Sequence, residues 1–549
     1  MSSSKLRLAE PFTDQGLNVK VDRKGVAFDD GGIKSRLLDL ETPCFIVEQE
    51  EGLGIGSASA KETPDSGLDA VAWAPAFTAQ HLGDPGFKRD HGIRYCYATG
   101  AMANGIASEA MVIAMGRAGF LASFGAGGLV PSRVERAIVA IQEALPDGPY
   151  AFNLIHSPSE PAIERDVVGL YLQYGVRCVE AAAFINLTRN IVYYRVAGLS
   201  EDDDGGVVIN NRVMAKISRN EVAARFLAPP PKKIVAQLVD EGLVTREQAA
   251  LAARVPMADD ITVEADSGGH TDNRPLVSLL SSVIALRNRV QEQEAYEKTV
   301  RVGAAGGIAT PEAAFAAFAM GAAYVVTGSV NQACVEANAS EHTRNLLAQA
   351  DMADTAMAPA SDMFEMGVKL QVLKRGTFFP MRAQKLYDLY TNHSSLEEIP
   401  QEEMEKLEKQ IFRKPIDSVW QETVAFFRER DPGQLERAQE SPKKKMALVF
   451  RWYLGLASKW SNSGDNERKL DYQIWCGPCM GAFNSWVKGS FLEGVNNRRV
   501  VDVALNIMTG AAYLNRLMML KSQSVVVPSE LTAFKPRKLR LDHNVGQIH

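Results

Sequence analysis

Two stretches of this 549-residue sequence carry residue types whose spacing could do chemistry. In Cys476-Gly477-Pro478-Cys479, two cysteines have the spacing of a dithiol redox motif. In Gly268-Gly269-His270, an imidazole that titrates near neutral pH follows a glycine pair. The first would interconvert a dithiol and a disulfide, and the second would donate or accept a proton beside a bound ligand.

The context of the cysteine pair does not favour redox chemistry. A thioredoxin-like site needs a buried apolar strand before the motif and a long helix after it. Here residues 466–475 are polar, and two glycines interrupt residues 483–494. Two thiols without a second pair also give poor support for structural zinc. We therefore expect Cys476 and Cys479 to lie partly buried in a turn, without a catalytic role.

A glycine-rich segment near the N-terminus could be mistaken for a dinucleotide-binding loop. Its G-x-G-x-G spacing over residues 52–56 departs from that fingerprint, and Pro64 and Gly67 would interrupt the helix that binds pyrophosphate. We expect residues 1–88 to form short strands and turns that act as an N-terminal cover.

Composition excludes several classes of protein. A net charge of −6 argues against a dedicated nucleic-acid binder. The best apolar run, residues 313–326, is too short to span a bilayer, and the first residues lack the apolar core of a signal peptide. The six cysteines do not form a disulfide framework, and no His-x-x-x-His pairing suggests a metal site. We expect a cytoplasmic protein without a metal, a membrane or a nucleic-acid partner.

Eight short apolar runs alternate with helix-like patterns in the middle of the chain. They are residues 93–100, 119–128, 149–155, 176–183, 211–218, 259–266, 299–307 and 322–329. Strands that alternate with helices indicate parallel β-α-β units, and eight of them predict an α/β protein built on a closed (β/α)8 barrel. An open doubly wound sheet is the alternative. A barrel would place the active site where the strands end.

The residues at these strand ends are rich in Gly, Asn and ionisable groups, which suits a large flat ligand. They include 102–105, 125–127, Asn153, Glu180, 216–218, 264–270, 306–307 and 328–329. The last two loops follow the seventh and eighth strands, where barrels usually bind phosphate. Thr310 and Pro311 also suit the start of a helix just after the first of these loops.

Several motifs together resemble a known family. "AGFLASFGAGG", "EADSGGH", "AAGGIATPEAA" and "GSVNQA" resemble the FMN-binding barrel shared by nitronate monooxygenases and flavin-dependent enoyl-acyl-carrier-protein reductases. "GAMANGIASEAMV", "KISRNEVAARFLAPPP" and "PASDMFEMGVKLQVLKRGTFFP" resemble the PfaD family, the enoyl reductases of polyunsaturated fatty acid synthases and some polyketide synthases. The resemblance runs from about Trp73 to about Arg516 and includes the cysteine pair.

The resemblance implies a function and a set of site residues. It implies one FMN per barrel, a reduced nicotinamide as the hydride source, with NADPH favoured and NADH left open, and a 2-enoyl thioester on an acyl carrier protein as substrate. His270 would hydrogen-bond the thioester oxygen or supply the proton. The residues implied to contact FMN are Ala101, Met102, Asn104, Asn153, Lys216, Glu264, Gly268, Gly269, Ala305, Gly306, Gly307, Gly328, Ser329 and Gln332.

Two other functions and the oligomeric state stay open at this point. A nitronate-monooxygenase-like oxidase would use the same FMN, with His270 as a base. A non-catalytic component of a synthase would keep the barrel as a scaffold. A homodimer is one candidate assembly, because barrel flavoenzymes of this type are often dimers.

The pattern divides the chain into four segments. Residues 1–88 are the N-terminal segment, 89–335 the barrel, 336–520 a mainly helical cap that shapes an acyl tunnel, and 521–549 a tail. Large apolar side chains are expected to line that tunnel: Met363, Phe364, Met366, Phe378 and Phe379. A mostly basic group either meets the acidic surface of a carrier protein or forms a solvated helix start after Pro442: Lys443, Lys444, Lys445, Arg451, Trp452 and Lys459.

Overall fold

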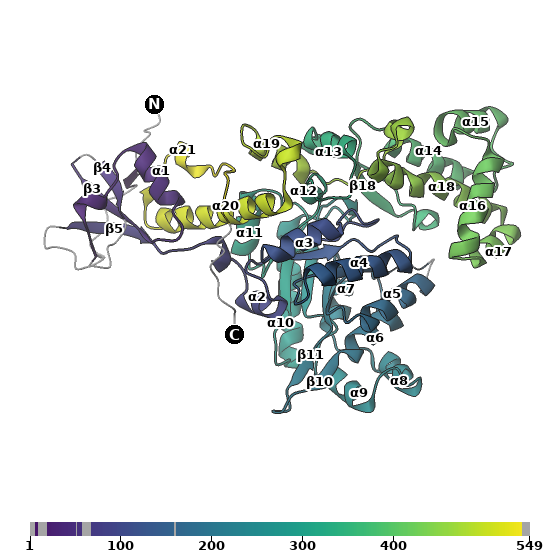
Figure 1. Cartoon of the computed structure of the whole chain (residues 1–549), viewed down its shortest axis with the longest axis horizontal. Coiled ribbons are helices and arrows are strands. Elements are labelled where there is room, and N and C mark those ends of the chain that lie inside the picture. The colour runs from purple at the N-terminus through teal and green to yellow at the C-terminus, as the bar shows by residue number, and fades with distance from the viewer. Residues whose placement is uncertain are drawn as a thin grey trace.

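A closed barrel of eight parallel strands lies at the centre of the computed structural model, which describes residues 6–8, 19–50, 52–56, 67–156, 158 and 161–540 (Figure 1). The strands are β6 (Tyr97–Thr99), β7 (Leu121–Phe124), β8 (Ala151–Ile155), β9 (Cys178–Ala182), β12 (Arg212–Ile217), β13 (Asp260–Glu264), β15 (Arg301–Ala305) and β16 (Val325–Thr327). The ring closes where β16 pairs with β6. Each predicted run contains one of these strands, so the barrel is confirmed and the open sheet is wrong.

Helices surround the barrel and connect its strands. They are α3 (Glu109–Arg117), α4 (Pro131–Ala144), α5 (Pro161–Gln173), α6 (Arg189–Ala197), α7 (Asn220–Leu227), α10 (Leu276–Glu294) and α11 (Pro311–Ala319). Local sequence fixes their starts: the Thr310 hydroxyl accepts from the amide of Ala313 at 3.4 Å, and Pro311 takes the first helical position. The predicted helix start after the seventh strand is therefore confirmed.

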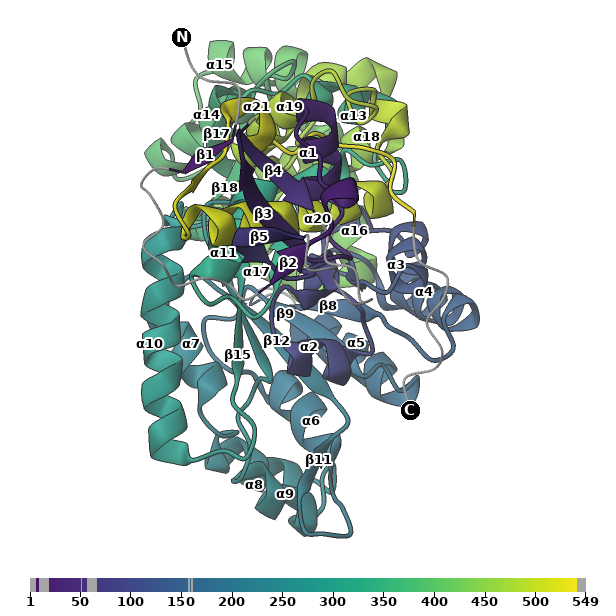
Figure 2. The ribbon, with the colours of Figure 1, turned by 90° about the vertical axis from the view of Figure 1, so that its left-hand side faces the viewer.

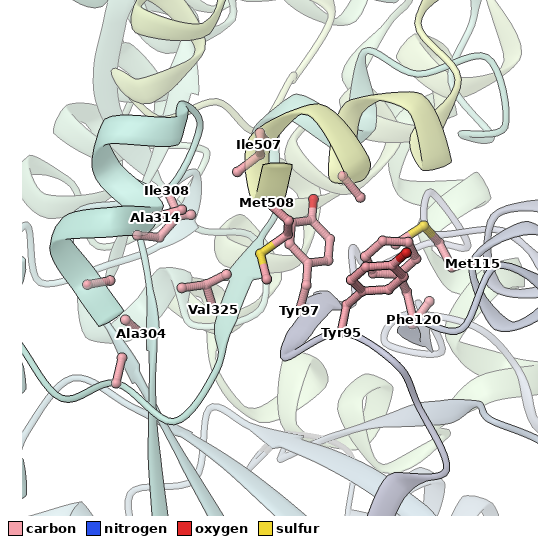
Figure 3. Packing of buried hydrophobic residues seen from close by; sticks show 14 of the residues in the cluster. Tyr95, Tyr97, Met115, Phe120, Ala304, Ile308, Ala314, Val325, Ile507 and Met508 are labelled. Atoms are coloured by element: carbon pink, nitrogen blue, oxygen red, sulfur yellow. The ribbon is translucent and has the colours of Figure 1, made fainter. Parts of the chain in front are cut away.

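The eighth outer helix comes from the far end of the sequence. After β16 the chain forms only α12 (Ser329–Gln332), which is too short to cover the barrel wall. Instead α20 (Val500–Lys521) packs against both α11 and α3, and so fills the gap between the seventh and first helices. Figure 3 shows Ile507 and Met508 of this helix beside Tyr97 and Val325 of the barrel strands. The C-terminal helix is thus part of the barrel shell.

The N-terminal segment forms a separate sheet that packs against α20 and is linked through this helix to the barrel (Figures 1 and 2). Its strands, in spatial order, are β2 (Lys20–Val21), β5 (Leu68–Ala74), β3 (Cys44–Gln49) and β4 (Gly52–Gly56). The buried guanidinium of Arg516 on α20 donates to the carbonyl oxygens of Thr42 at 2.7 Å and Pro75 at 3.2 Å. Beyond α20, β19 (Val525–Val526) pairs with β1 (Arg7–Leu8). The predicted cap, residues 336–520, contained most of α20. We propose instead that α20 belongs with the barrel shell and the N-terminal sheet.

The glycines of β4 serve packing. A Cβ on Gly54 would lie 2.6 Å from the side chain of Val26, and one on Gly56 would lie 2.4 Å from Val21. These glycines sit within an antiparallel strand and not in a loop that precedes a helix. Pro64, which entered the prediction for this segment, and residues 541–549 of the predicted tail lie outside the described residues.

The cap has a hydrophobic core of its own over one end of the barrel (Figure 1). Its elements are β17 (Thr355–Pro359), β18 (Lys369–Leu373), α14 (Phe379–Asn392), α15 (Gln401–Lys406), α16 (Ile416–Arg430), α17 (Gly433–Glu440) and α18 (Pro442–Ser463). Phe364, Phe379, Phe412, Phe450 and Tyr453 are fully buried in this core. The cap and the barrel meet at the ends of the strands, where the candidate site lies.

Candidate active site

One large cavity gathers all of the residues predicted to bind the cofactor. It has a volume of about 1640 Å³ and lies between the carboxyl ends of the barrel strands and the cap. Its lining includes every predicted cofactor contact, namely Ala101, Met102, Asn104, Asn153, Lys216, Glu264, Gly268, Gly269, Ala305, Gly306, Gly307, Gly328, Ser329 and Gln332, and also the predicted catalytic residue His270. The residues come from six of the eight strands or the loops that follow them. Their roles toward a cofactor remain predictions.

The loops after β15 and β16 form a cradle of open backbone. Gly306 and Gly307 have φ angles of +79° and +78°, which favour glycine. A Cβ on Gly306 would lie 2.6 Å from the backbone of Ala265, whereas a Cβ on Gly307 or Gly328 would meet nothing within 4 Å. The two strands are neighbours, so both loops face the same space. Open backbone beside a cavity is what close approach of a phosphate requires.

The cysteine motif packs against this cradle. The chain at Gly477 lies against Gly268, and its amide donates to the Ser329 hydroxyl at 3.0 Å. Cys479 begins α19 (Cys479–Val487) and lines the cavity, while Cys476 is buried, and both thiols are free. Burial raises the pKa of Cys479 to about 11 and raises the pKa of Cys476 well above its ordinary value, so both thiols stay protonated at neutral pH. A protonated thiol is a poor nucleophile, and this disfavours dithiol catalysis.

An ion cluster spans the ends of three neighbouring strands. The Lys216 ammonium on β12 lies 2.9 Å from Glu264 on β13 and 3.4 Å from Glu180 on β9. Glu180 also accepts from the amide of Ala101 at 3.0 Å. Burial lowers the pKa of Lys216, but the two carboxylates outweigh it and hold the pKa above its ordinary value. The site therefore keeps a fixed cation on the barrel floor, where a polar ring edge could meet it.

Glu180 was not among the predicted cofactor contacts. The sequence already placed Glu180 at a predicted strand end of the barrel, and this position was the signal that could have identified it as a site residue. Its backbone carbonyl also accepts from the Asn153 amide at 3.1 Å, which orients that buried side chain. Asn104 has φ +58° and donates to Ser458 on α18 at 3.1 Å, so this predicted contact also ties the barrel to the cap.

His270 is held by the cap. It lies in β14 (Gly269–His270), whose backbone pairs with β18 so that His270 lies opposite Leu370. Strand pairing with this distant segment fixes the backbone of His270. About a third of the imidazole stays exposed toward the cavity.

A carboxylate partner for His270 comes from the cap and was missed by the sequence analysis. Asp362 Oδ1 lies 3.1 Å from His270 Nε2. Burial lowers the pKa of His270, but Asp362, and more weakly Glu264, raise it above its ordinary value. The imidazolium in turn lowers the pKa of Asp362, although burial raises it. The pair therefore favours a protonated, oriented imidazole at the cavity wall.

Two predictions about the cap are mostly wrong. Of the five predicted tunnel side chains only Met363 lines the cavity: Phe364 and Phe379 belong to the cap core, and Met366 and Phe378 face solvent. A different set forms the apolar wall: Ile155, Ile163, Val167, Phe184, Ile185, Val222, Phe426, Phe427, Leu448 and Leu454. Aromatic and Met stripes on helices fill cores more often than they line sites.

Most of the cations predicted to form a basic surface are bonded to other residues of the cap. Lys443 donates to backbone carbonyls, Lys444 pairs with Glu365, and Lys445 lies 3.9 Å from Glu397. Arg451 also pairs with Glu365, at 3.5 Å. Of the predicted cations, Lys459 is exposed and lines the cavity.

The residues present fit FMN better than they fit a metal ion. The cradle offers open glycine backbone for a phosphate, and Lys216, Asn153 and His270 supply polar groups around a wide cavity. The buried hydroxyl of Ser267 lines the same cavity and has no hydrogen-bond partner among the residues that the structure describes. The described residues contain no group of three or more His, Cys, Asp or Glu side chains that could hold a metal ion. In the same part of the chain, no helix combines the length and apolar character needed to cross a membrane.

Comparison with known proteins places this site in a family. A family model for nitronate monooxygenase matches residues 89–398, more than half of the chain. A model for the N-terminal domain of fatty acid synthase subunit PfaD matches residues 20–76. A third, for the inserted helical domain of [acyl-carrier-protein] S-malonyltransferase, matches residues 393–472.

Curated relatives that match this chain are longer than it is. A polyunsaturated fatty acid synthase subunit of Thraustochytrium sp. is 48% identical over 497 residues, covering 89% of this chain and 33% of the relative. The polyketide biosynthesis protein PksE of Bacillus subtilis is 45% identical over 456 residues, covering 83% of this chain and 59% of the relative. The chain thus spans about a third to three-fifths of these two relatives.

A solved structure covers nearly the same unit. The enoyl reductase domain of MlnA, from the macrolactin biosynthesis cluster of Bacillus amyloliquefaciens, is 40% identical with a TM-score of 0.77. The match covers 80% of this chain and 99% of that domain. Together with the matches to the barrel and N-terminal models, this shows that the chain belongs to the PfaD family, with a barrel of the nitronate monooxygenase type.

Proposed function

We propose that this protein is an FMN-dependent enoyl reductase that reduces 2-enoyl thioesters on an acyl carrier protein, with NADPH as the hydride source. The observation that carries the proposal is the His270–Asp362 pair, which orients an imidazole with a raised pKa at the wall of a cavity whose floor is the ends of the barrel strands. The likeness to the MlnA enoyl reductase domain supports this reaction over a nitronate-monooxygenase-like oxidase and over a non-catalytic scaffold.

The chain offers distinct groups for each end of FMN. Gly306, Gly307, Gly328 and Ser329 would hold the phosphate, because their backbone borders open space at two neighbouring strand ends. Toward the ring, Lys216 would meet the pyrimidine edge, and its two carboxylate partners keep it charged for that role. The other predicted contacts would line the ring and the ribityl chain.

His270 would act on the thioester. When bound, FMN supplies hydride from the reduced nicotinamide to the β-carbon of the enoyl chain. The double-bond electrons then move toward the thioester oxygen, which needs a hydrogen-bond donor, and the α-carbon needs a proton. Because Nε2 of His270 pairs with Asp362, Nδ1 is the nitrogen left to face the substrate. Asp362 is a positioning residue that keeps the imidazole charged and oriented.

The proposal that an acyl carrier protein is the partner rests on the relatives. The curated relatives are components of polyunsaturated fatty acid and polyketide biosynthesis, and residues 393–472 are similar to a domain of an enzyme named for the acyl carrier protein. We therefore propose an acyl carrier protein as the donor of the enoyl chain. A homodimer remains a proposal from the same resemblance.

The test is product formation by the purified protein reconstituted with FMN. Under anaerobic conditions, NADPH and a crotonyl-type thioester on a carrier protein should yield the saturated acyl chain, detected by mass spectrometry. Matched reactions would contain NADH, no substrate, or a nitronate in the presence of oxygen. Turnover that depends on oxygen and a nitronate instead would favour the oxidase, and failure to bind FMN would favour the scaffold.

A further inference from the structure

The cavity has room for more than a cofactor. Its volume of about 1640 Å³ exceeds the roughly 300–1,000 Å³ of most small-molecule sites. From the strand ends it continues outward between α16 and α18 of the cap and α4, α5 and α7 of the barrel. This outer part is the portion with the apolar wall, so a long, partly apolar ligand could extend from the surface to His270.

The lining residues that are exposed to solvent mark where the cavity opens. Among them are three cations on three different helices, namely Arg136 on α4, Arg225 on α7 and Lys459 on α18. We call these three residues the cationic rim. None of them has an ion-pair partner among the residues that the structure describes. The exposed part of the lining also includes apolar side chains, among them Ile185 at 58% and Phe426 at 52% exposure.

The charge of the rim contrasts with that of the whole chain. The protein has a net charge of −6, yet its cavity opening is bordered by cations from both the barrel and the cap. Exposed acidic residues in the cavity lining are fewer than these exposed cations. Glu422 is paired with Lys414 and the Trp452 indole, and Glu221 lies on α7 one turn from Arg225. A cationic, partly apolar opening on an acidic protein is complementary to an acidic partner that carries an apolar chain.

We infer that this opening is the docking surface for an acyl carrier domain, an inference that rests on the proposed function. Acidic side chains of the carrier, together with the phosphate of its pantetheine arm, would face the cationic rim. The arm would pass Ile185 and Phe426 and bring the thioester to His270. The lysines at 443–445 are not part of this surface, because they are engaged within the cap.

The test compares one enoyl chain on two carriers. One substrate is the enoyl carrier protein, and the other is the enoyl thioester of N-acetylcysteamine, which lacks both the protein and the phosphate. The double charge reversal Arg136→Glu with Lys459→Glu should lower kcat/KM about tenfold or more with the carrier protein, and much less with the small thioester. Added salt should weaken the wild-type preference for the carrier and have little effect on the variant.

Matched controls separate docking from general effects. Lys233→Glu reverses an exposed charge on α8 (Lys232–Asp240), at the end of the barrel away from the cap, and should change neither substrate's kinetics (Figure 1). Phe426→Ala should raise KM for the carrier substrate, whereas Phe378→Ala should not. Both rings are exposed and lie 5.4 Å from an arginine, but only Phe426 lines the cavity.

Several outcomes would overturn the inference. Equal losses with both substrates would mean that the rim acts on the fold or the chemistry, and no loss with the carrier would place docking elsewhere. Should the double variant fail to bind FMN, the single change Arg225→Gln gives the same comparison. A wild-type protein that reduces neither thioester would refute the proposed function itself. Normal reduction by the wild type, with no effect of the substitutions in the cationic rim, would refute only the docking surface.

Discussion

The two ends of strand β13 carry charged residues that have different roles. At its start, Asp260 is fully buried and bonds Arg301 at 2.6 Å and His91 at 2.8 Å. Arg301 also bonds Asp90 at 2.6 Å, so these charges are paired within the protein. At its end, four residues later, Glu264 pairs with Lys216 beside an open cavity. One strand thus anchors the fold at one end and offers charge to a ligand at the other.

The difference shows how a barrel separates stability from function. The cluster at the start of β13 does not line the cavity and links strands β13 and β15 to α2 (Pro85–His91). The cluster at the end has a second carboxylate, Glu180, and stands beside a histidine whose orientation depends on the cap. Changes at the two ends should therefore have separable effects on unfolding and on turnover.

Asp260→Asn should have the largest effect on stability. It leaves Arg301, whose side chain is 11% exposed, without its main partner, and breaking such a pair costs about 3–5 kcal/mol. Urea unfolding followed by circular dichroism should show this loss in the free energy of unfolding. The fraction that remains folded should bind FMN with wild-type affinity. A normal free energy of unfolding with weakened FMN binding would contradict the division between the two ends.

The same cluster should set the acid limit of the fold. Burial raises the pKa of Asp260, but Arg301 and His91 lower it to about 2. A depressed carboxyl pKa contributes stability above the unfolded value of about 3.9, and this stability is lost as the pH falls toward 2. Unfolding measured between pH 5 and pH 2 should show this loss in the wild type and a much smaller pH dependence in Asp260→Asn.

Gly307→Ala should weaken FMN binding by more than it weakens the fold. The residue has φ +78°, so any side chain is strained by about 1–3 kcal/mol, and the new methyl group would enter the cradle. Gly175→Ala is the matched control, since Gly175 has φ +65° and open space around it but does not line the cavity. Fluorescence titration should find weaker FMN binding in the first variant only. Equal FMN affinities of the two variants would contradict the proposal that this loop binds the phosphate.

Asp362→Asn should move the pH profile of turnover. The carboxylate raises the pKa of His270, so its loss lowers that pKa and leaves less imidazolium at neutral pH. The alkaline limb of kcat/KM should therefore shift to lower pH, and Asp362→Glu should restore it in part. A uniform loss of activity with an unchanged profile would mean that Asp362 only supports the local structure.

Cys479→Ser should have the smallest effect. Its thiol pKa of about 11 keeps it protonated, and its position against Ser329 and Gly307 is a packing role. Turnover should stay close to that of the wild type, with no change in sensitivity to mild disulfide reagents. A large loss of turnover together with a loss of disulfide-reductase activity would revive the dithiol hypothesis.

The sequence predicted the barrel because its signals are local. Each strand is a short buried run bounded by glycine or polar residues, and Thr310 and Pro311 mark a helix start within a few residues. The predicted cofactor residues lie together because the ends of parallel strands meet at one edge.

Features that depend on distant segments were missed. The pairing of β14 with β18, the approach of Asp362 to His270, and the place of α20 in the barrel shell join residues about 90 to 400 positions apart. No local pattern specifies such contacts. The tunnel prediction failed for a related reason, since periodicity finds the apolar face of a helix without telling whether it meets a core or a cavity.

The most direct test of the account is anaerobic stopped-flow absorbance of the FMN-loaded wild type and His270→Ala. NADPH should bleach the flavin band at similar rates in both proteins. Reoxidation by a crotonyl thioester on its carrier protein should be about 10²- to 10⁴-fold slower in the variant, the usual range for loss of a general acid. Equal reoxidation rates in the two proteins, or a wild-type flavin that only oxygen can reoxidise, would contradict the assignment of enoyl reduction to this site.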